Sequence, residues 1–454
     1  MGNVRKRPAF RHYTDMNLLR TIRISLVLLL LAAVPGFRTA ARTGPETALH
    51  AGVLPDTTVF SDLPDTTVRL TFSVDGKVTD QDSGKPVEGA EVGAPEQGYY
   101  TVTNRDGVFT LKSDRPLTRI TFSFPGYETR TLYPGTTGGK NMVVRLNPVS
   151  TLLKEAIVVS GNPREILRDA LAMVPVNYPV RTELSDCFYR ETVQKRNRYI
   201  TVSEAVTLMQ KSSYNHQIWQ DRVAVRQGRQ LMSPRRNDTL AVKVTGGPVQ
   251  AVTLDVVKNR EILFDDLDLY RLEMLPAEII DGRPHFVIRI DPDAPECTYA
   301  LYRGKIYVDQ VSLAFSRIEL SLDTSDKDKA TRMMLVSKPH RLRFTPRELS
   351  LTVSYTADPD DGLMRLRYIR TRFSFHCDWK KRLLATSFTA VNEMVVTHRH
   401  TEGPIGFSRK EAFPRNASLA DRIGEFDDPD FWKDYNIIEP SESLEHAIGR
   451  IRKR

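Results

Sequence analysis

Residues that form disulfides or bind metals are scarce in this chain. It contains three cysteines and nine histidines among 454 residues. The cysteines are Cys187, Cys297 and Cys377. In an oxidising compartment they allow at most one disulfide and leave one thiol over. The sequence permits either disulfide state, and we expect buried, unpaired thiols at all three positions.

Signatures of common catalytic sites are also absent from the sequence. It has no Gly-x-Ser-x-Gly nucleophile elbow, no Gly-Lys-Ser/Thr phosphate loop and no His-Glu-x-x-His helix. Missing motifs lower the expectation of catalysis without excluding an unfamiliar site. We therefore predict a non-catalytic protein with no catalytic residues and no cofactor.

Long apolar runs are confined to the N-terminal region. A mainly apolar run, residues 24–34, follows several arginines and precedes Pro35-Gly36 and the small residues Thr39-Ala40-Ala41. This order predicts a secretory signal peptide over residues 1–41, with Met1 or Met16 as the start. An uncleaved anchor is the alternative, although the run is shorter than the roughly 20 residues that a spanning helix needs. We expect no transmembrane span in the mature chain.

A strong charge of one sign is missing once the predicted leader is removed. Residues 1–41 hold seven of the 65 Lys and Arg residues and one of the 56 Asp and Glu residues. Their removal leaves 58 basic and 55 acidic residues, so the formal charge falls from +9 to +3. No cationic field for nucleic acid remains, and we predict no nucleic-acid partner.

Residues 42–70 have the composition of a linker. The segment is rich in Thr, Pro and Asp, and residues 54–59 (Leu-Pro-Asp-Thr-Thr-Val) recur as residues 63–68. Two copies are too few for a repeat architecture. We expect an extended tether.

Short strand patterns separated by turn residues occupy residues 71–147. Turn chemistry recurs at residues 80–84 (Asp-Gln-Asp-Ser-Gly), at residues 104–107 (Asn-Arg-Asp-Gly) and at Pro125-Gly126. Gly107 suits a turn position with positive φ, and Phe109 and Leu111 share one face of the following strand. This spacing predicts a small antiparallel β-sandwich.

The same residues resemble the carboxypeptidase regulatory-like domain. The resemblance rests on residues 75–80 (Asp-Gly-Lys-Val-Thr-Asp), 84–92, 103–111 and 122–129. It implies a seven-stranded, transthyretin-like β-sandwich, found beside carboxypeptidases or at the N-terminus of TonB-dependent outer-membrane receptors. Neither partner is expected here: no histidine is followed by glutamate three residues later, and residues 165–454 are too few for a receptor barrel. Within the connector, residues 148–164, Leu153–Ser160 resembles the segment that commonly follows this domain.

Residues 165–436 predict a larger, β-rich C-terminal domain. A helix begins at Pro163 and ends at Pro175, with an apolar stripe along one side. Strand alternation follows at residues 286–290, 311–322, 349–355 and 364–368. Its phase slips between Phe315 and Ile318, which predicts a β-bulge. We expect long, curved antiparallel strands with few helices, closed by a helix over residues 437–454.

One strand pair resembles the periplasmic lipoprotein-carrier-like proteins. It comprises residues 304–310 (Gly-Lys-Ile-Tyr-Val-Asp-Gln) and residues 314–319 (Ala-Phe-Ser-Arg-Ile-Glu). The resemblance implies an open β half-barrel over a helix that holds acyl chains. The predicted fold class is therefore mainly β: a transthyretin-like sandwich followed by a curved sheet or half-barrel.

The best candidate for a metal site is His398 with His400. On a strand, residues i and i+2 share a face, so both imidazoles could reach one ion, with Glu402 as a third ligand. Two polar residues near a strand end are the simpler interpretation, so we predict no metal. His376 and Cys377 point to opposite faces of a strand and cannot form a dyad. The acidic clusters at residues 265–268 and 323–328 lack the calcium-loop pattern.

These observations predict an exported envelope protein, periplasmic or associated with the outer membrane of a Gram-negative bacterium. The leading hypothesis is a binding protein that holds an apolar or extended, lipid-like ligand in its larger β domain. The second is a scaffold whose sandwich docks onto an outer-membrane protein partner. The third is a hydrolase of unrecognised type.

Overall fold

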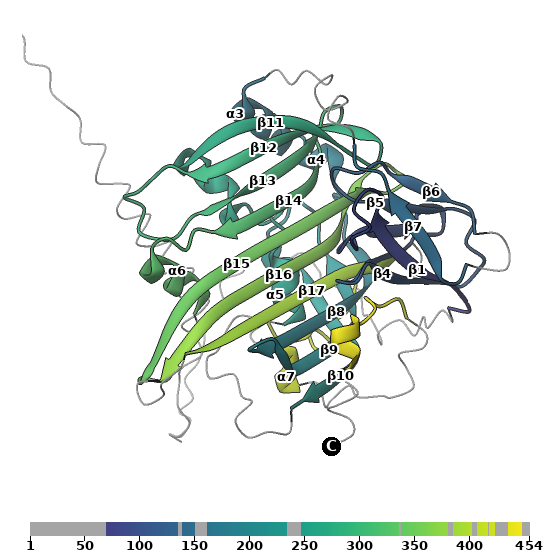
Figure 1. Ribbon diagram of the computed structural model, residues 1–454. Helices are drawn as coiled ribbons and strands as arrows, with labels where there is room; N and C mark the ends of the chain where they lie inside the picture. The colour runs from purple at the N-terminus through teal and green to yellow at the C-terminus, as the bar shows by residue number, and fades with distance from the viewer. Residues whose placement is uncertain are drawn as a thin grey trace, which may run out of the picture. The chain divides into compact units, whose positions relative to one another are not determined.

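The computed structural model describes residues 70–134, 139–149, 161–233, 247–335, 337–379, 385–401, 406–415, 417–422 and 435–446. The predicted signal peptide and nearly all of the predicted linker lie outside these residues, as do Leu153–Ser160 and Glu402. The described chain is mainly β, and its strands are long in the C-terminal part (Figure 1). The predicted fold class is confirmed.

Seven short strands form the N-terminal sandwich. They are β1 (Phe72–Asp80), β2 (Glu91–Ala94), β3 (Tyr99–Val102), β4 (Val108–Ser113), β5 (Ile120–Ser123), β6 (Arg130–Leu132) and β7 (Met142–Leu146), with a 3-10 turn η1 (Pro95–Gln97). One layer has the order β4-β1-β7 and the other β3-β2-β5-β6. The prediction of a purely antiparallel sandwich was wrong in one place, because β7 pairs with β1 in parallel.

The core of the sandwich confirms the prediction that Phe109 and Leu111 share one face of β4. Phe109 and Leu111 are fully buried together, and Phe109 meets Phe122 of β5 edge to face, with ring centroids 5.3 Å apart. Tyr127 closes the rim, where its hydroxyl donates to Asp80 at 2.9 Å. Gly107 has φ +75°, as the turn requires.

Replacing Gly107 by alanine should destabilise the fold by about 1–3 kcal/mol. A Cβ at this position would lie 2.3 Å from the Val78 carbonyl oxygen, in addition to the cost of positive φ. Gly84→Ala is the matched control, since Gly84 has φ +65° with nothing within 4 Å of the new Cβ. Urea unfolding of both variants measures the difference. Equal losses of unfolding free energy in the two variants would show that the close approach to Val78 does not add to the destabilisation.

The larger sheet is built from long antiparallel strands. They are β8 (Glu183–Lys195), β9 (Arg198–Lys211), β10 (Arg222–Met232), β11 (Tyr270–Ile280), β12 (Arg283–Pro292), β13 (Tyr302–Asp309), β14 (Phe315–Leu322), β15 (Leu342–Ala357), β16 (Met364–Trp379) and β17 (Thr386–His400). Consecutive strands from β11 to β17 pair in chain order, β8 pairs with β17 and β9, and β10 pairs with β9. A bridge from His398 to Tyr99 joins β17 to β3, so the described residues form one 14-stranded sheet.

Short helices and turns cover one face of the larger sheet, which we call the inner face. They are α3 (Pro163–Ala172), α4 (Val174–Asn177), α5 (Pro248–Thr253), η3 (Arg260–Ile262) and η4 (Phe264–Leu269). The other short elements are η2 (Ile218–Gln220), α6 (Lys327–Met334), which contacts β15, and α7 (Leu419–Arg422), which contacts β9. In Figure 1, α5 lies behind β16 and β17. One buried apolar cluster joins α3, α4 and α5 to the inner-face residues of the strands. The side chains of these helices therefore fill the space under the sheet.

The face opposite the inner face, which we call the outer face, contacts the sandwich. Three β-bulges of the larger sheet place side chains at this contact. The register shifts at Ser316 in β14, at Arg367 in β16 and at Thr397 in β17. An extra residue at each point changes which face the following side chains occupy. The bulge predicted from the phase slip between Phe315 and Ile318 is therefore confirmed. However, residues 311–313 form the preceding turn instead of strand, because Leu313 has φ +57°.

Aromatic residues of the sandwich contact the side chains at these bulges. The Arg317 guanidinium lies 5.3 Å from the Phe124 ring centroid, and that of Arg367 lies 3.3 Å from Tyr100. His398 stacks on Tyr99, with ring centroids 4.7 Å apart. The bulges thus form much of the contact between the sandwich and the outer face.

The C-terminal segment, residues 435–446, fastens the sandwich to the larger sheet. The Asn436 side chain hydrogen-bonds both backbone groups of Lys112 in β4. Ile438 is buried among Val102 of β3, Phe188 of β8 and Tyr368 of β16. The closing helix begins at residue 442, not 437 as predicted, because residues 437–440 run extended against the sandwich. Leu444 is buried as expected, whereas Ile448 and Ile451 lie outside the described residues.

Candidate functional site

The candidate metal residues His398 and His400 lie on one face of β17. His398 and His400 both follow the Thr397 bulge, and their ring centroids are 5.7 Å apart. His398 Nδ1 lies 3.2 Å from the Gly98 carbonyl oxygen, and burial lowers the pKa of this imidazole. His400 Nε2 lies 3.1 Å from Asp186 Oδ2. The described residues contain no group of three His, Cys, Asp or Glu side chains arranged to hold a metal, and Glu402 lies outside them.

The other residues singled out in the sequence have structural roles. Cys377 is buried, and burial raises the pKa of its thiol to about 11. All three cysteines are unpaired, and Cys297 is half-buried instead of buried as expected. Asp326 caps α6 by accepting from the backbone N–H of Asp328 and Lys329.

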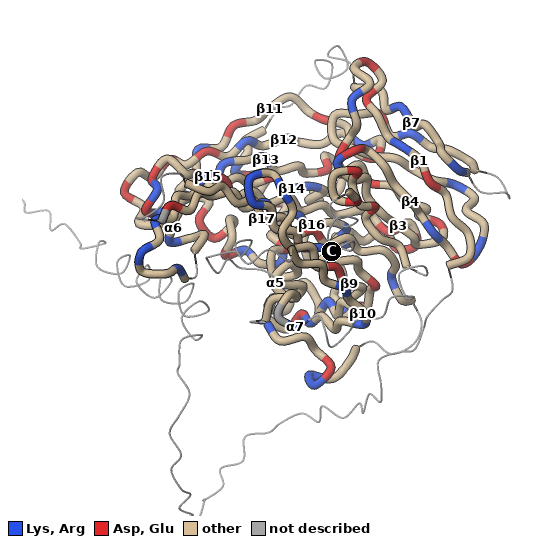
Figure 2. Tube along the Cα trace, turned by 60° about the horizontal axis from the view of Figure 1, so that its bottom comes forward, with Lys and Arg blue, Asp and Glu red and all other residues tan. Residues whose placement is uncertain are grey.

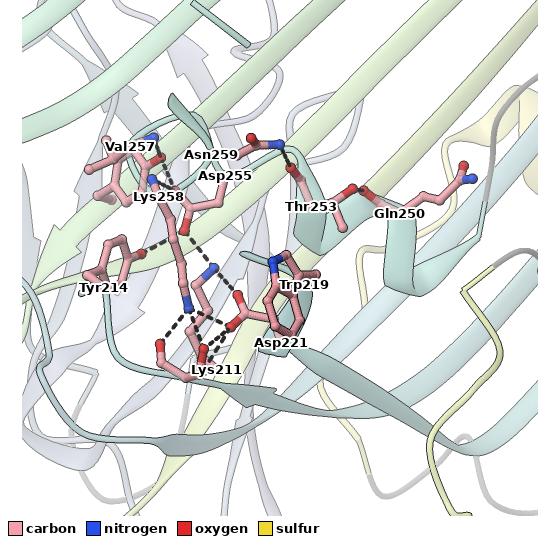
Figure 3. Close-up of polar contacts among 12 residues, drawn as sticks. Lys211, Tyr214, Trp219, Asp221, Gln250, Thr253, Asp255, Val257, Lys258 and Asn259 are labelled. Atoms are coloured by element: carbon pink, nitrogen blue, oxygen red, sulfur yellow. Dashed lines mark hydrogen bonds and ion pairs between the residues drawn. The ribbon is translucent and has the colours of Figure 1, made fainter. Parts of the chain in front are cut away.

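A buried cluster of two lysines and two aspartates lies under the larger sheet. We call Lys211, Asp221, Asp255 and Lys258 the lysine–aspartate cluster (Figure 3). Lys211 Nζ lies 2.8 Å from Asp221 and 2.7 Å from Asp255. Lys258 Nζ donates to Asp221 Oδ1 at 2.5 Å and to Ser212 Oγ at 2.8 Å.

Tyrosine hydroxyls complete the coordination of this cluster. Tyr214 and Tyr355 donate to the two carboxylate oxygens of Asp255, at 2.8 and 2.6 Å. Burial lowers the pKa of Lys258 to about 8, and the neighbouring Lys211 charge adds to this shift. Burial alone would also lower the pKa of Lys211, but Asp221 and Asp255 outweigh it and raise that pKa.

The lysine–aspartate cluster is a closed network and not an open reaction centre. Both carboxylates are fully engaged, and the two positive charges balance the two negative ones. Its members come from the end of β9, the residue just before β10 and the segment after α5, and Tyr355 comes from β15. The cluster therefore fixes the position of α5 against three strands.

An open, polar groove lies on the outer face, between the larger sheet, the sandwich and the C-terminal segment. We call it the arginine groove; its volume is about 800 Å³. Its walls carry five arginines: Arg105, Arg190, Arg198, Arg370 and Arg372. The wall has two carboxylates, Glu88 and Glu393.

The arginines of the groove keep part of their hydrogen-bonding capacity. Arg370 pairs with Glu88 at 2.7 Å, yet its Nε is buried without a hydrogen bond, 3.5 Å from Glu393. Arg372 pairs with Glu348 at 3.1 Å, and both side chains remain well exposed. The groove can therefore offer further N–H donors to an anion.

The groove also binds extended backbone from the chain itself. Arg190 donates to the carbonyl oxygen of Ile438, and Asn104 Nδ2 donates to that of Pro440 at 3.1 Å. The wall's side chains are therefore placed to hold a chain in extended form through its carbonyl oxygens.

Sequence reasoning missed both the cluster and the groove. Lys211, Asp221, Asp255 and Lys258 show no motif spacing, and alternation alone could not indicate that Arg370 and Arg372 face the sandwich. Basic and acidic residues are scattered over both parts of the fold, so no single stretch stands out (Figure 2). No helix among the described ranges is long and apolar enough to cross a membrane.

Several solved structures are similar to this chain at low identity. A domain described as an outer membrane lipoprotein-sorting protein, from Vibrio parahaemolyticus, is 11% identical, covers 54% of this chain and 94% of its own, and has a TM-score of 0.22. A LolA superfamily protein from Nitrosomonas europaea is 15% identical, with 54% and 96% coverage and a TM-score of 0.19. A DUF1329 family protein from Desulfovibrio piger is 13% identical, with 52% and 94% coverage and a TM-score of 0.21.

Sequence comparison assigns a family to the sandwich alone. No curated protein matches the chain. A family model does match residues 74–159, which contain the quoted motifs from Asp75 to Thr129. The predicted resemblance is thereby confirmed: residues 74–159 match the CarboxypepD_reg-like domain.

Proposed function

We propose that this protein is an exported, non-catalytic binding protein of the cell envelope, and that its arginine groove holds an extended, acidic segment of a protein partner. The observation that carries the proposal is the composition of the groove, whose wall holds five arginines and two carboxylates around a volume of about 800 Å³. Two of these arginines also pair with carboxylates outside the wall, Arg190 with Glu204 and Arg372 with Glu348. Charge-assisted hydrogen bonds from arginine are stronger than neutral ones and suit carboxylates. The predicted leader supports export.

Extended backbone is the ligand form that fits the groove. Residues 437–440 already lie along its wall, held through carbonyl oxygens by Arg190 and Asn104. A partner segment beside them would use the remaining donors of Arg105, Arg370 and Arg372. Specificity for acidic side chains follows from these charged N–H donors.

An apolar ligand under the sheet has less support. The inner face packs against α3, α4 and α5, and their apolar side chains share one core cluster with the strands. An acyl chain in this part of the molecule would have to displace these helices. Native mass spectrometry of protein exported through its own leader tests that alternative, since a bound lipid would appear as added mass.

An acidic peptide should bind to the groove and lose affinity when the groove's charge is reduced. The probe is fluorescein-labelled hexaglutamate, measured by fluorescence anisotropy at two salt concentrations. We expect Arg105→Gln/Arg372→Gln to weaken binding roughly tenfold, about 1.4 kcal/mol, because it removes two of the five arginines. Binding should also weaken with added salt.

Arg303→Gln is the matched control for this experiment. Arg303 lies on β13, away from the groove, and resembles Arg372 in exposure and in pairing with one carboxylate, Asp323. Labelled hexaglutamine controls for the dye and the backbone. Equal affinity for the two peptides, or equal losses in the groove and control variants, would contradict the proposal.

A further inference from the structure

A second, smaller cavity lies where β3 and η1 of the sandwich meet the ends of β16 and β17. We call it the junction cavity; its volume is about 180 Å³. This space is large enough to hold water or a small ion. It shares no lining residue with the arginine groove.

Arg367 is the unusual residue of the junction cavity. Its side chain is 4% exposed, and its guanidinium stacks on the Tyr100 ring and donates to the Val396 carbonyl oxygen at 3.1 Å. Its Nε is buried without a hydrogen bond. Among the described residues, Arg367 forms no ion pair with a carboxylate, whereas a buried charge normally has such a partner.

Every carboxylate in the cavity wall already pairs with a different basic residue. Glu96 pairs with Arg119, Glu183 with Arg365, and Asp358 and Asp360 with Arg399. Arg367 is therefore the basic residue of the wall without a carboxylate at ion-pair distance, although Glu183, Asp358 and Asp360 share only Arg365 and Arg399. Glu91, close by on β2, accepts from the Thr356 hydroxyl at 2.8 Å and attracts Arg367 electrostatically.

The other basic groups of the wall are compensated. Lys211 faces two aspartates of the lysine–aspartate cluster, and Arg115 lies 3.9 Å from Asp114. The Tyr100 hydroxyl is a second buried donor without a partner. Two unused donors, one of them charged, thus belong to side chains that line the same cavity.

The backbone is arranged to place Arg367 at this point. Arg367 is the extra residue of a β-bulge in β16. Its neighbours Leu366 and Tyr368 pair with the consecutive residues Tyr355 and Ser354 of β15. Without the bulge, residues 366 and 368 would share the inner face. With it, Leu366 packs inward while Tyr368 packs outward against Val102 of β3. Bulges of this kind are common beside functional sites because they re-aim side chains.

We infer that the junction cavity binds a small anionic group, a carboxylate or phosphate, with Arg367 as the charged donor and Tyr100 as a second donor. The group is either a free ion or the terminus of a larger molecule that enters beside the exposed Arg115. The inference does not depend on the arginine groove, because the two sites have separate walls.

Calorimetric titration of the full chain tests this assignment with inorganic phosphate, sodium acetate and hexyl phosphate at constant ionic strength. We expect saturable binding of at least one anion, with a Kd on the order of 1 mM. Arg367→Met should weaken it at least tenfold, and Tyr100→Phe several-fold. Tighter binding of hexyl phosphate than of phosphate would identify the terminus of an amphiphile, and equal binding a free ion. Absence of saturable binding up to about 50 mM for all three would overturn the inference.

Thermal unfolding separates an anion site from a structural arginine. Without added anion, Arg367→Met should be at least as stable as the wild type, because it removes a buried charge that has no ion-pair partner. Phosphate at saturation should raise the Tm of the wild type and leave that of Arg367→Met unchanged. Arg303→Gln, at an exposed arginine of β13 that lines neither site, is the control and should respond to phosphate as the wild type does. If Arg367→Met lowered the Tm by the same amount with and without phosphate, the role of Arg367 would be structural and the inference wrong.

Discussion

Replacing Asp255 by asparagine is expected to lower the free energy of unfolding by about 3–5 kcal/mol, the usual cost of breaking a buried ion pair by removing one partner. Asp255 is completely buried, pairs with Lys211 at 2.7 Å, and accepts hydrogen bonds from Tyr214 and Tyr355. Asparagine keeps the shape but removes the charge. The lysine–aspartate cluster would then hold two lysines against a single aspartate.

The measurement is chemical denaturation at neutral pH. Asp268→Asn is the matched control: this carboxylate also pairs with a basic residue, Arg164 at 2.8 Å, but it is 92% exposed. An exposed pair contributes about 1 kcal/mol or less. A loss below about 1 kcal/mol in Asp255→Asn would show that the cluster does not hold α5 against the strands.

Glu204→Gln is expected to cost a similar 3–5 kcal/mol at neutral pH and to change the response to acid. Glu204 is completely buried between Arg190 at 2.7 Å and Arg229 at 2.5 Å. Burial alone would raise the pKa of Glu204, but the two guanidinium groups outweigh it and lower the pKa below 4.5. Removing the Glu204 charge leaves Arg190 and Arg229 without the carboxylate that they share.

The sign of the acid effect follows from the lowered pKa. A carboxyl with a depressed pKa in the folded state contributes stability above its unfolded value, near 4.5, and loses it as the pH falls through the folded value. The wild type should therefore lose stability more steeply below about pH 4.5 than Glu204→Gln, and the two curves should converge in acid.

Unfolding curves collected from neutral to acid pH provide this comparison. Glu96→Gln, an exposed carboxylate that pairs with Arg119 at 3.1 Å, is the control and should follow the wild type throughout. Parallel curves for the wild type and Glu204→Gln would mean that Glu204 does not titrate below its ordinary range. The arginine pair would then have to be compensated in another way.

Local patterns were sufficient to predict the strands and several turns. Phe109 and Leu111 alternate with polar neighbours and are both buried, and Gly107 has the positive φ that its turn needs. The phase slip after Phe315 marks the bulge at Ser316. These features depend on backbone conformation and on the face that each side chain occupies, and both are set by neighbours in sequence.

Strand partners and functional surfaces depended on contacts between distant residues. The sequence contains nothing to indicate that β7 would pair with β1 in parallel, or that residues 437–440 would run extended along the sandwich instead of opening a helix. The candidate residues of the sequence have structural contacts instead: Asp326 caps α6, His400 pairs with Asp186, and His398 stacks on Tyr99 of the sandwich.

The sequence by itself thus determined a mainly β protein, a CarboxypepD_reg-like sandwich and a curved sheet with a bulge near residue 316. The tertiary structure decided where charge would accumulate. Lys211 and Asp255, or Arg105 and Arg372, are far apart along the chain and meet only because strand pairing and the docked sandwich bring them together. Electrostatic sites depend on distance in space and on burial, and alternation along one strand encodes neither.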